Sequence, residues 1–391
     1  MNRPGIAVLA LISPLLLGAG EPAPAPDFAA DARSIERLVD EDYAYLDRFE
    51  GGRMPMSDKL RADADAVDSR DALIRFAERA LAALADHHAI TGSSLEDSWG
   101  LVPSYADLWI ERRGADYVIT DVRAGSPATQ AGVAAGDRLI AAGGVPIAEA
   151  VAAFWADLGL PAAAGRTDFA ARVLAAGRRN APRRLTVARG AAAPRDLVLP
   201  NLYAAGPGDR PPLTAARNGR DRVIRFNDSL GEDGTIPAFD TAMAQARPGE
   251  RIVLDLTDTA SGGNTSVARA IMSWFVDRPT GYQVHQLPAE ERQTGVARQW
   301  IEQVLPRPGK HHRGPVTVRV GRWTGSMGEG LAIGFDAIGA RVEGGPMAGL
   351  LGAVYDYKLE QSGLVIKFPV ERLFHVNGTP REAFEPRRAG G

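Results

Sequence analysis

A short glycine-rich segment decides the fold: Trp323-Thr324-Gly325-Ser326-Met327-Gly328-Glu329-Gly330. An apolar stretch at residues 316–320 predicts a strand before it, and the periodicity of residues 328–338 predicts a helix after it. The Ser326 hydroxyl would then lie at a helix N-terminus, where free N–H groups and the helix dipole favour negative charge. That position suits a nucleophile whose reaction forms an oxyanion. However, Ser326 and Glu329 also form the Ser-x-x-Glu pattern of a capping box, which this motif alone favours.

A second polar turn occurs upstream. Residues 251–256 predict a buried strand, and Ser261-Gly262-Gly263-Asn264 follows it, before a helix predicted at residues 267–275. A Gly-Gly turn exposes backbone N–H groups, so Gly262 or Gly263 is a candidate donor to an oxyanion. An ordinary tight turn between a strand and a helix is the alternative.

Strand and helix patterns alternate through the C-terminal half of the chain. Such alternation predicts an α/β layer in which helices connect the strands. The Pro/Gly-rich run at residues 204–212 is the best linker candidate. We therefore predict an α/β domain at residues 213–388.

A glycine-rich string marks a separate domain at residues 96–203. It reads Gly125-Ser126-Pro127-Ala128, then Ala131-Gly132-Val133, then Gly136-Asp137-Arg138-Leu139-Ile140. In this order and spacing, the string resembles the PDZ fold. The resemblance implies a β-rich domain that binds an extended peptide as an added strand at a sheet edge. A β-rich domain with ordinary turn glycines is the alternative.

The N-terminal part is helical in pattern. Apolar residues recur at intervals of three and four around residues 35–43 and 73–85, which predicts a small helical domain at residues 28–95. Ahead of it, Arg3, an apolar run at residues 6–17 and small residues at 18–20 form an export signal.

We therefore predict a signal peptide at residues 1–20, a Pro/Ala-rich tail at residues 21–27, and a periplasmic or secreted protein. An uncleaved membrane anchor is the alternative, and either arrangement leaves a membrane tether at the N-terminus open.

The composition excludes several classes of function. The chain has no cysteine, so thiol catalysis, disulfides and thiolate metal sites are excluded. Its net charge of -3 indicates no general attraction to nucleic acid. Six histidines occur without the spacing of a metal-binding motif, so we expect no metal and no other cofactor.

A serine nucleophile needs a base, and a third group usually orients that base. Histidine is the better base at neutral pH, although a lone histidine is more often structural. Spacing alone cannot bring these groups together. The candidate bases are His88, His375, Lys358 and Lys367, and the candidate carboxylates are Glu382 and Glu385.

Taken in order, these features resemble the C-terminal-processing, or tail-specific, serine peptidases, whose relatives include the tricorn core. The resemblance covers about residues 30–388 and is most specific at residues 255–264 and 324–330. It implies a ClpP/crotonase-like catalytic domain of the α/β class, joined to a PDZ-like domain and a small helical N-terminal domain. It also implies a serine nucleophile, here Ser326.

The resemblance further implies roles for particular residues. The branch that uses histidine carries an N-terminal "LxDgH" turn, which Leu84-Ala85-Asp86-His87-His88 matches with His88 as the base. His87 is the neighbouring alternative. Glu382 matches the late glutamate that would orient the imidazole. The oxyanion donors would be the amides of Gly262 or Gly263 and of Met327.

Two positions depart from the family pattern. The branch that uses lysine carries it in a "GKG"-like turn, but residues 344–352 contain no lysine. Thr257 stands where an arginine usually follows Asp-Leu, so the local charge network differs from the family pattern.

The resulting hypothesis is an exported serine endopeptidase that cleaves extended or C-terminal peptide segments of protein substrates. A catalytically inactive peptide-binding or ligand-binding protein on the same fold is the main alternative. A crotonase-like acyl-CoA enzyme and an esterase are weaker ones.

Overall fold

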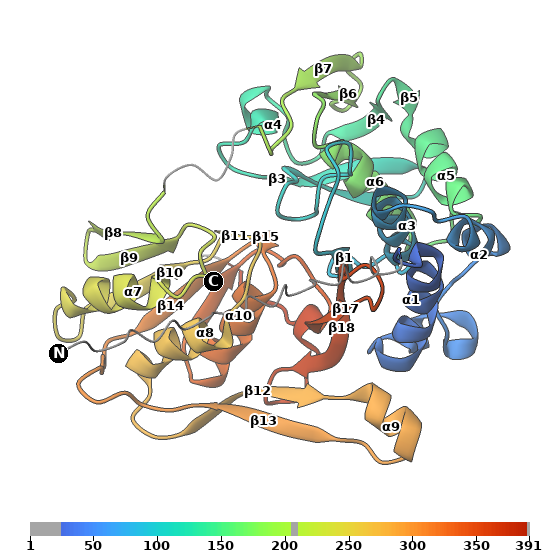
Figure 1. Cartoon of the computed structure of the whole chain (residues 1–391). Helices are drawn as coiled ribbons and strands as arrows, with labels where there is room; N and C mark the ends of the chain where they lie inside the picture. Colours follow the sequence, from blue (N-terminus) through green and yellow to red (C-terminus); the bar gives the residue numbers. More distant parts are fainter. Residues whose placement is uncertain (1–24, 205–209, 389–391) are drawn as a thin grey trace, which may run out of the picture.

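The protein is described here by a computed structural model that covers residues 25–204 and 210–388 (Figure 1). The predicted signal peptide at residues 1–20 lies outside the described residues. So do most of the tail predicted at residues 21–27 and most of the linker predicted at residues 204–212. Within the described ranges, no helix has the length and apolar character needed to cross a membrane.

The N-terminal unit is helical, as its periodicity predicts. Each of its three α-helices begins at a side-chain cap, since Asp27, Ser57 and Ser69 accept hydrogen bonds from backbone N–H groups in the first turn. The apolar faces pack against one another around the fully buried Ile35 and Leu73. The elements are α1 (Phe28–Asp42), η1 (Leu46–Arg48), η2 (Glu50–Gly52), α2 (Asp58–Asp65), α3 (Arg70–Ala82) and β1 (Ile90–Thr91).

The PDZ-like unit is a sheet of order β2-β3-β4-β6-β7, with β5 beside β4. A buried bidentate ion pair joins Asp107 to Arg183, with N–O distances of 2.5 and 3.0 Å, and Asp107 also accepts from the N–H of Ala128. This pair fixes the glycine-rich string to the sheet. The elements are β2 (Leu108–Arg113), β3 (Asp116–Val122), α4 (Pro127–Gln130), β4 (Arg138–Ala142), β5 (Val145–Pro146), α5 (Ile147–Asp157), α6 (Thr167–Ala176), β6 (Arg183–Ala188) and β7 (Arg195–Leu199).

The C-terminal unit is built on a sheet of order β16-β14-β10-β9-β8. Its four strands from β16 to β9 are parallel and β8 is antiparallel to β9, so the predicted α/β alternation is confirmed. The three central residues of β10, at 252–254, are apolar and buried because helices cover the sheet. The elements are β8 (Leu213–Asn218), β9 (Asp221–Phe226), α7 (Thr235–Ala244), β10 (Arg251–Asp255), β11 (Asp258–Thr259), α8 (Thr265–Met272), η3 (Ser273–Phe275), β14 (Val316–Val320), β15 (Trp323–Thr324), α10 (Met327–Ala337) and β16 (Arg341–Gly344).

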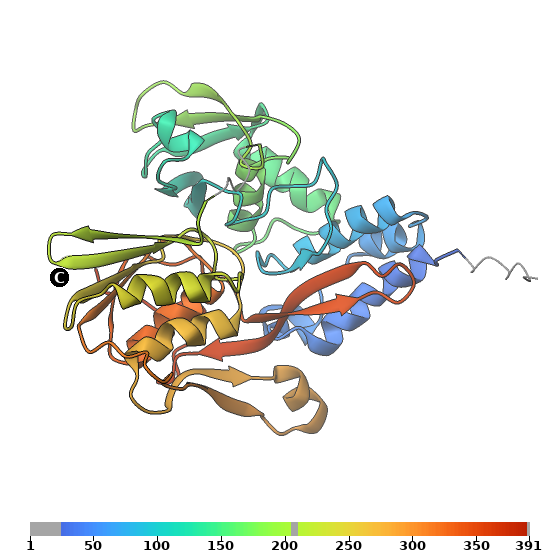
Figure 2. The same ribbon diagram turned by 60° about the vertical axis from the view of Figure 1, so that its left-hand side comes forward.

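A second sheet, which the sequence did not predict, connects the C-terminal unit to the N-terminal helices. Its order is β1-β18-β12-β13, with β17 paired to β18, and β1 pairs with β18 at Ile90 and Lys367. Figure 2 shows the long β17–β18 hairpin reaching the N-terminal helices. The elements are β12 (Thr280–Gln286), α9 (Pro288–Thr294), β13 (Gln299–Val304), β17 (Ala353–Lys358), β18 (Val365–Phe374) and η4 (Arg381–Ala383).

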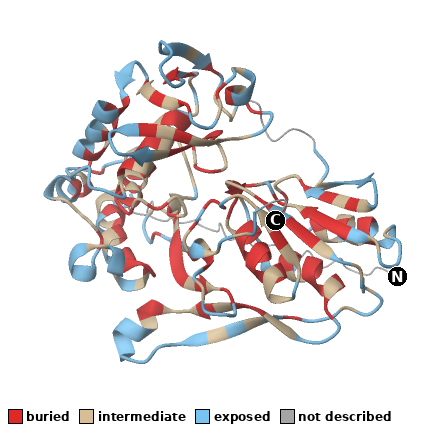
Figure 3. Ribbon diagram, turned by 180° about the vertical axis from the view of Figure 1, so that it is seen from behind, coloured by how far each residue is buried: buried red, intermediate tan, exposed pale blue. Residues whose placement is uncertain are grey.

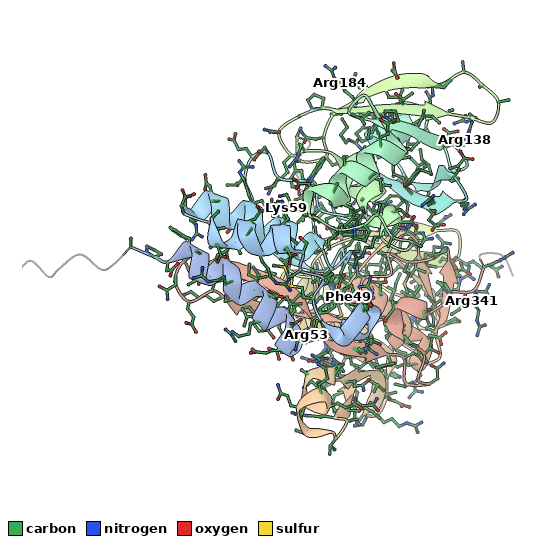
Figure 4. All side chains as sticks on the ribbon, turned by 90° about the vertical axis from the view of Figure 1, so that its right-hand side faces the viewer. Phe49, Arg53, Lys59, Arg138, Arg184 and Arg341 are labelled. Carbon is green, nitrogen blue, oxygen red and sulfur yellow. The ribbon has the colours of Figure 1, made fainter. Side chains whose placement is uncertain are left out.

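The three units pack against one another. Buried residues run through the strands and through the helices that cover them, whereas the outer loops are exposed (Figure 3). In Figure 4, Lys59 on α2 lies where the N-terminal helices meet the PDZ-like unit. At this junction the Ser57 hydroxyl donates to the carbonyl of Leu158 at 2.6 Å. The domain boundaries themselves stay predictions.

Candidate active site

A two-stranded parallel ladder brings the two glycine turns together. Strands β11 and β15 pair with Thr259 opposite Thr324. Both threonine hydroxyls donate to the carbonyl of Leu256, at 2.5 and 2.7 Å, and the N–H of Gly325 donates to the carbonyl of Thr259 at 3.0 Å. The turn after β10 therefore lies directly beside the turn that carries Ser326, at the carboxyl ends of the parallel strands, where α/β proteins usually bind ligands.

Three backbone N–H groups are left available where these turns meet. A Cβ on Gly263 would lie only 2.9 Å from the Cβ of Met327, so glycine is required for this approach. Gly262 has a φ of +70°, in the left-handed region that favours glycine. No described residue accepts a hydrogen bond from the N–H groups of Gly262, Gly263 or Met327. Free amides at a turn and at a helix start are the donors that an oxyanion requires.

Ser326 is held in a strained backbone conformation. It has a φ of +51° and a ψ of -114°, which is unusual for a residue with a side chain. Strain of this kind is typical of a nucleophile carried on a sharp turn between a strand and a helix. The Glu329 carboxylate accepts from the N–H of Ser326 at 2.9 Å, and the Ser326 side chain faces the N–H of Glu329, so the capping box is present. The partly exposed hydroxyl has another partner, because it lies 3.1 Å from Nε2 of His88.

Both the backbone and the ring of His88 are held by hydrogen bonds. Its backbone N–H donates to Oδ1 of Asp86 at 2.9 Å, and Oδ2 of Asp86 accepts from the hydroxyl of Tyr43. Nδ1 lies 2.5 Å from the carbonyl oxygen of Leu351. Because a carbonyl oxygen can only accept, Nδ1 carries the proton and Nε2 presents its lone pair to the Ser326 hydroxyl.

The protonation state of His88 suits a base. Burial lowers the pKa of His88 to about 4, and the positive charge of Arg381 acts in the same direction, against the raising effect of the Leu351 carbonyl. His88 is therefore neutral at neutral pH and can accept a proton.

The two other candidate histidines, His87 and His375, make different contacts. The ring of His87 stacks on Phe169 with centroids 4.5 Å apart, against helix α6 of the PDZ-like unit. Its Nε2 is buried and has no hydrogen-bond partner among the described residues. At the end of β18, Nδ1 of His375 accepts from the N–H of Asn377 at 3.0 Å. Of the histidines that the sequence proposed, His88 is the one that contacts Ser326.

The expected contact between Glu382 and His88 is corrected by the structure. The Leu351 carbonyl occupies the position at Nδ1 that the carboxylate was expected to fill. Oε2 of Glu382 is buried without a partner among the described residues. Burial of Tyr45 raises the pKa of that tyrosine, and the charge of Glu382 raises it further. Glu382 therefore lies close to the N-terminal unit without orienting the ring.

Sequence reasoning missed the role of two buried charged residues, Glu329 and Arg381. Glu329 is fully buried, and its carboxylate accepts from the N–H groups of Gly349 and Leu350 as well as that of Ser326. Burial raises the pKa of Glu329 to about 7, although Arg381 and these N–H donors act to lower it. The Ser-x-x-Glu pattern was the available signal for Glu329, but a helix cap alone explained that pattern.

The two departures from the family pattern have local explanations. The region at residues 344–352 supplies a backbone carbonyl to the base in place of a lysine side chain. The hydroxyl of Thr257 donates to Oδ1 of Asp255 at 2.6 Å.

Within the described ranges, no group of three or more acidic or histidine side chains is arranged to hold a metal ion.

The PDZ-like unit contacts the segment just before the nucleophile. The indole N–H of Trp323 donates to the carbonyl of Ala106 at 2.7 Å. The guanidinium of Arg322 pairs with Glu111 at 2.7 Å and with Asp121 at 3.3 Å. The position of this unit is thereby fixed relative to the turn that carries the candidate nucleophile.

Comparisons with known proteins support this architecture. The model of the PDZ domain family matches residues 118–153, inside the domain predicted at residues 96–203. The photosystem II D1 C-terminal processing protease shares the fold at 17% identity over 93% of both chains, with a TM-score of 0.56. Mature CPAF complexed with lactacystin is 12% identical over 92% of this chain and 93% of that chain, also with a TM-score of 0.56. A comparison with curated proteins finds no match.

The chain therefore has the fold of the C-terminal processing serine proteases and carries a PDZ domain. The predicted fold class is confirmed. A PDZ domain on a protease fold fits protein or peptide substrates.

Proposed function

We propose that this chain is a serine endopeptidase that cleaves extended peptide segments, with Ser326 as the nucleophile and His88 as the base. One observation carries the proposal: Nε2 of His88 lies 3.1 Å from the Ser326 hydroxyl while a carbonyl fixes the proton on Nδ1. A nucleophile within hydrogen-bond reach of an oriented base is the arrangement that acyl transfer needs. The fold shared with processing proteases supports the same reaction class.

The reaction would proceed through an acyl-enzyme. His88 removes the hydroxyl proton as Oγ of Ser326 bonds to the scissile carbonyl carbon, and the amides of Gly262 or Gly263 and of Met327 bind the resulting oxyanion. The imidazolium then gives its proton to the leaving amine as the C–N bond breaks. Water, deprotonated by the same imidazole, releases the acid product and restores Ser326.

In our proposal the Leu351 carbonyl orients His88, which is the role that the family resemblance implied for Glu382. The PDZ domain would add the peptide as a strand to an exposed sheet edge, so that an extended segment reaches Ser326.

The test is the replacement Ser326→Ala. We expect it to lower peptidase activity by about 10³-fold or more while leaving the thermal unfolding temperature nearly unchanged. A fluorophosphonate should label the unaltered protein at Ser326, as peptide mass spectrometry can establish. Full activity in Ser326→Ala would refute the proposal, and a fully folded protein that neither reacts nor cleaves would favour the binding-protein alternative.

We also propose that the chain is exported to the periplasm or beyond, by means of the signal at residues 1–20. The support is the sequence pattern of Arg3, an apolar run and small residues. N-terminal sequencing of the protein from its native host should find a mature start at residues 19–21, directly after one of the small residues at 18–20. An intact Met1 on protein recovered from the cytoplasm would contradict export.

A further inference from the structure

Glu329 connects the nucleophile to a neighbouring loop. Its Oε2 accepts from the N–H of Ser326 at 2.9 Å and from the N–H of Leu350 at 3.2 Å, while Oε1 accepts from the N–H of Gly349 at 2.9 Å. One carboxylate therefore fixes the backbone of Ser326 relative to the loop at residues 349–352.

Arg381 holds the same loop by its carbonyl groups. Its Nη2 donates to the carbonyls of Leu350 and Gly352, at 2.7 and 2.8 Å. The carbonyl between them belongs to Leu351, and this is the group that lies 2.5 Å from Nδ1 of His88. The loop is thus held on both sides of the acceptor that orients the base.

We propose that Glu329 and Arg381 are positioning residues that set the distance between the Ser326 hydroxyl and the His88 ring, acting through the Leu351 carbonyl. This inference rests on the proposed function and names the groups that make its geometry. The third group of the site is then the Leu351 carbonyl, in a loop held by the buried carboxylate of Glu329 and the buried guanidinium of Arg381.

A role limited to helix capping does not account for this arrangement. Glu329 is fully buried and Arg381 is 2% exposed. Burying a charged group costs several kcal/mol unless hydrogen bonds and opposite charge offset it. A cap on α10 needs only the contact with the N–H of Ser326, and an exposed carboxylate makes such contacts equally well. Among the described residues, the remaining side-chain hydrogen bonds of Glu329 and Arg381 go to the loop at residues 349–352.

The first test is Glu329→Gln. Glutamine offers one acceptor oxygen, and its NH₂ group must face one of the N–H donors that now bind the carboxylate. A resulting shift of about 1 Å between base and nucleophile lowers kcat by about 10²-fold. KM should stay within about twofold, because the carboxylate does not touch the peptide; a steady-state assay with a quenched fluorescent peptide separates the two constants.

Glu250→Gln is the matched control. Glu250 also carries a largely buried carboxylate that accepts from a backbone N–H, that of Arg247, but it precedes β10 and so lies at the end of the sheet away from Ser326. We expect this variant to keep kcat within about twofold, as is usual for a site with no shared partners. An unaltered kcat in Glu329→Gln would overturn the inference. So would equal losses of kcat in Glu329→Gln and Glu250→Gln at equal unfolding temperatures.

Arg381 gives a second test that does not depend on the folding of the first variant. Arg381→Lys keeps the charge and the donors, whereas Arg381→Met loses both. In the Met variant, loss of the cation should raise the pKa of both His88 and Glu329, because Arg381 lowers both. The acid limb of kcat/KM should therefore move to higher pH. The Lys variant should keep the original limb and more of kcat. Identical pH profiles and identical kcat values in the two variants would overturn the inference.

The inference and the proposed function fail in different ways. If Ser326→Ala stays fully active, the proposed function is lost and the positioning role with it. If Ser326→Ala is inactive but Glu329→Gln has a normal kcat, the peptidase stands and the positioning role alone is refuted.

Discussion

The replacement Gly263→Ala tests the contact between the two glycine turns most directly. The new Cβ would lie 2.9 Å from the Cβ of Met327. Carbon atoms in contact prefer about 3.5–4.0 Å, so the two turns must separate by roughly 0.6–1.1 Å. The Cβ of Met327 belongs to the first residue of α10, and its displacement therefore moves a candidate oxyanion donor away from the other.

The expected loss follows from that displacement. A misplacement of about 1 Å, or the loss of one oxyanion donor, lowers kcat by about 10²–10³-fold, equivalent to about 3–4 kcal/mol of transition-state stabilisation. Overpacking should also lower the free energy of unfolding by about 1–3 kcal/mol. The assay is peptide hydrolysis at saturating substrate, together with the rate of fluorophosphonate labelling and a denaturant titration.

Gly321→Ala is the control for this experiment. Gly321 lies just before the same turn, and a Cβ there would meet nothing within 4 Å. Its activity and stability should match those of the unaltered protein. A folded Gly263→Ala variant with normal kcat would refute the assignment of the oxyanion donors to these two turns.

Four further outcomes are expected. Burial raises the pKa of Glu329 to about 7, and the positioning role needs the ionised form, so kcat should rise as the pH passes through about 7. The contribution of Glu329 to stability runs the other way: it is complete below the ordinary pKa of 4.5 and is lost as the pH rises through about 7. Measurements of kcat and of the thermal unfolding temperature on both sides of pH 7 check these opposite trends. The depressed pKa of His88 implies stability that is present above 6.5 and lost as pH falls through about 4, which acid titration of the fold checks. Asp107→Asn leaves Arg183 buried without its partner and should lower the free energy of unfolding by about 3–5 kcal/mol in a denaturant titration; a change below about 1 kcal/mol would contradict the importance of this pair. His87→Phe should keep more than half of the activity, because this ring stacks on the PDZ unit, and an inactive folded variant would reopen the choice of base.

Short-range patterns in the sequence were sufficient to predict much of the molecule. The periodicity around residues 73–85 predicted α3, and the alternation after residue 213 predicted the parallel sheet. The glycine-rich string near residue 125 indicated the PDZ domain, which the match at residues 118–153 confirms. These features are decided by local sequence, because turns and apolar periodicity depend on residues only a few positions apart.

The second sheet could not be predicted in the same way. Strand β1 has two residues, and its partner β18 lies more than 270 positions further along the chain at Ile90 and Lys367. Neither strand carries a local signal for the other, since register between distant strands is set by packing and by the chain between them. This pairing nevertheless fixes the segment that follows His88.

The sequence by itself determined the chemistry that is available: a hydroxyl at a predicted helix start, two glycine-containing turns, histidines that could act as bases, and no thiol. Only the tertiary structure decided which groups meet. It placed His88 against a hydroxyl 238 positions away and oriented the ring with a backbone carbonyl instead of Glu382. A backbone carbonyl has the same chemistry in every residue, so no side-chain pattern can reveal which one will face a distant ring.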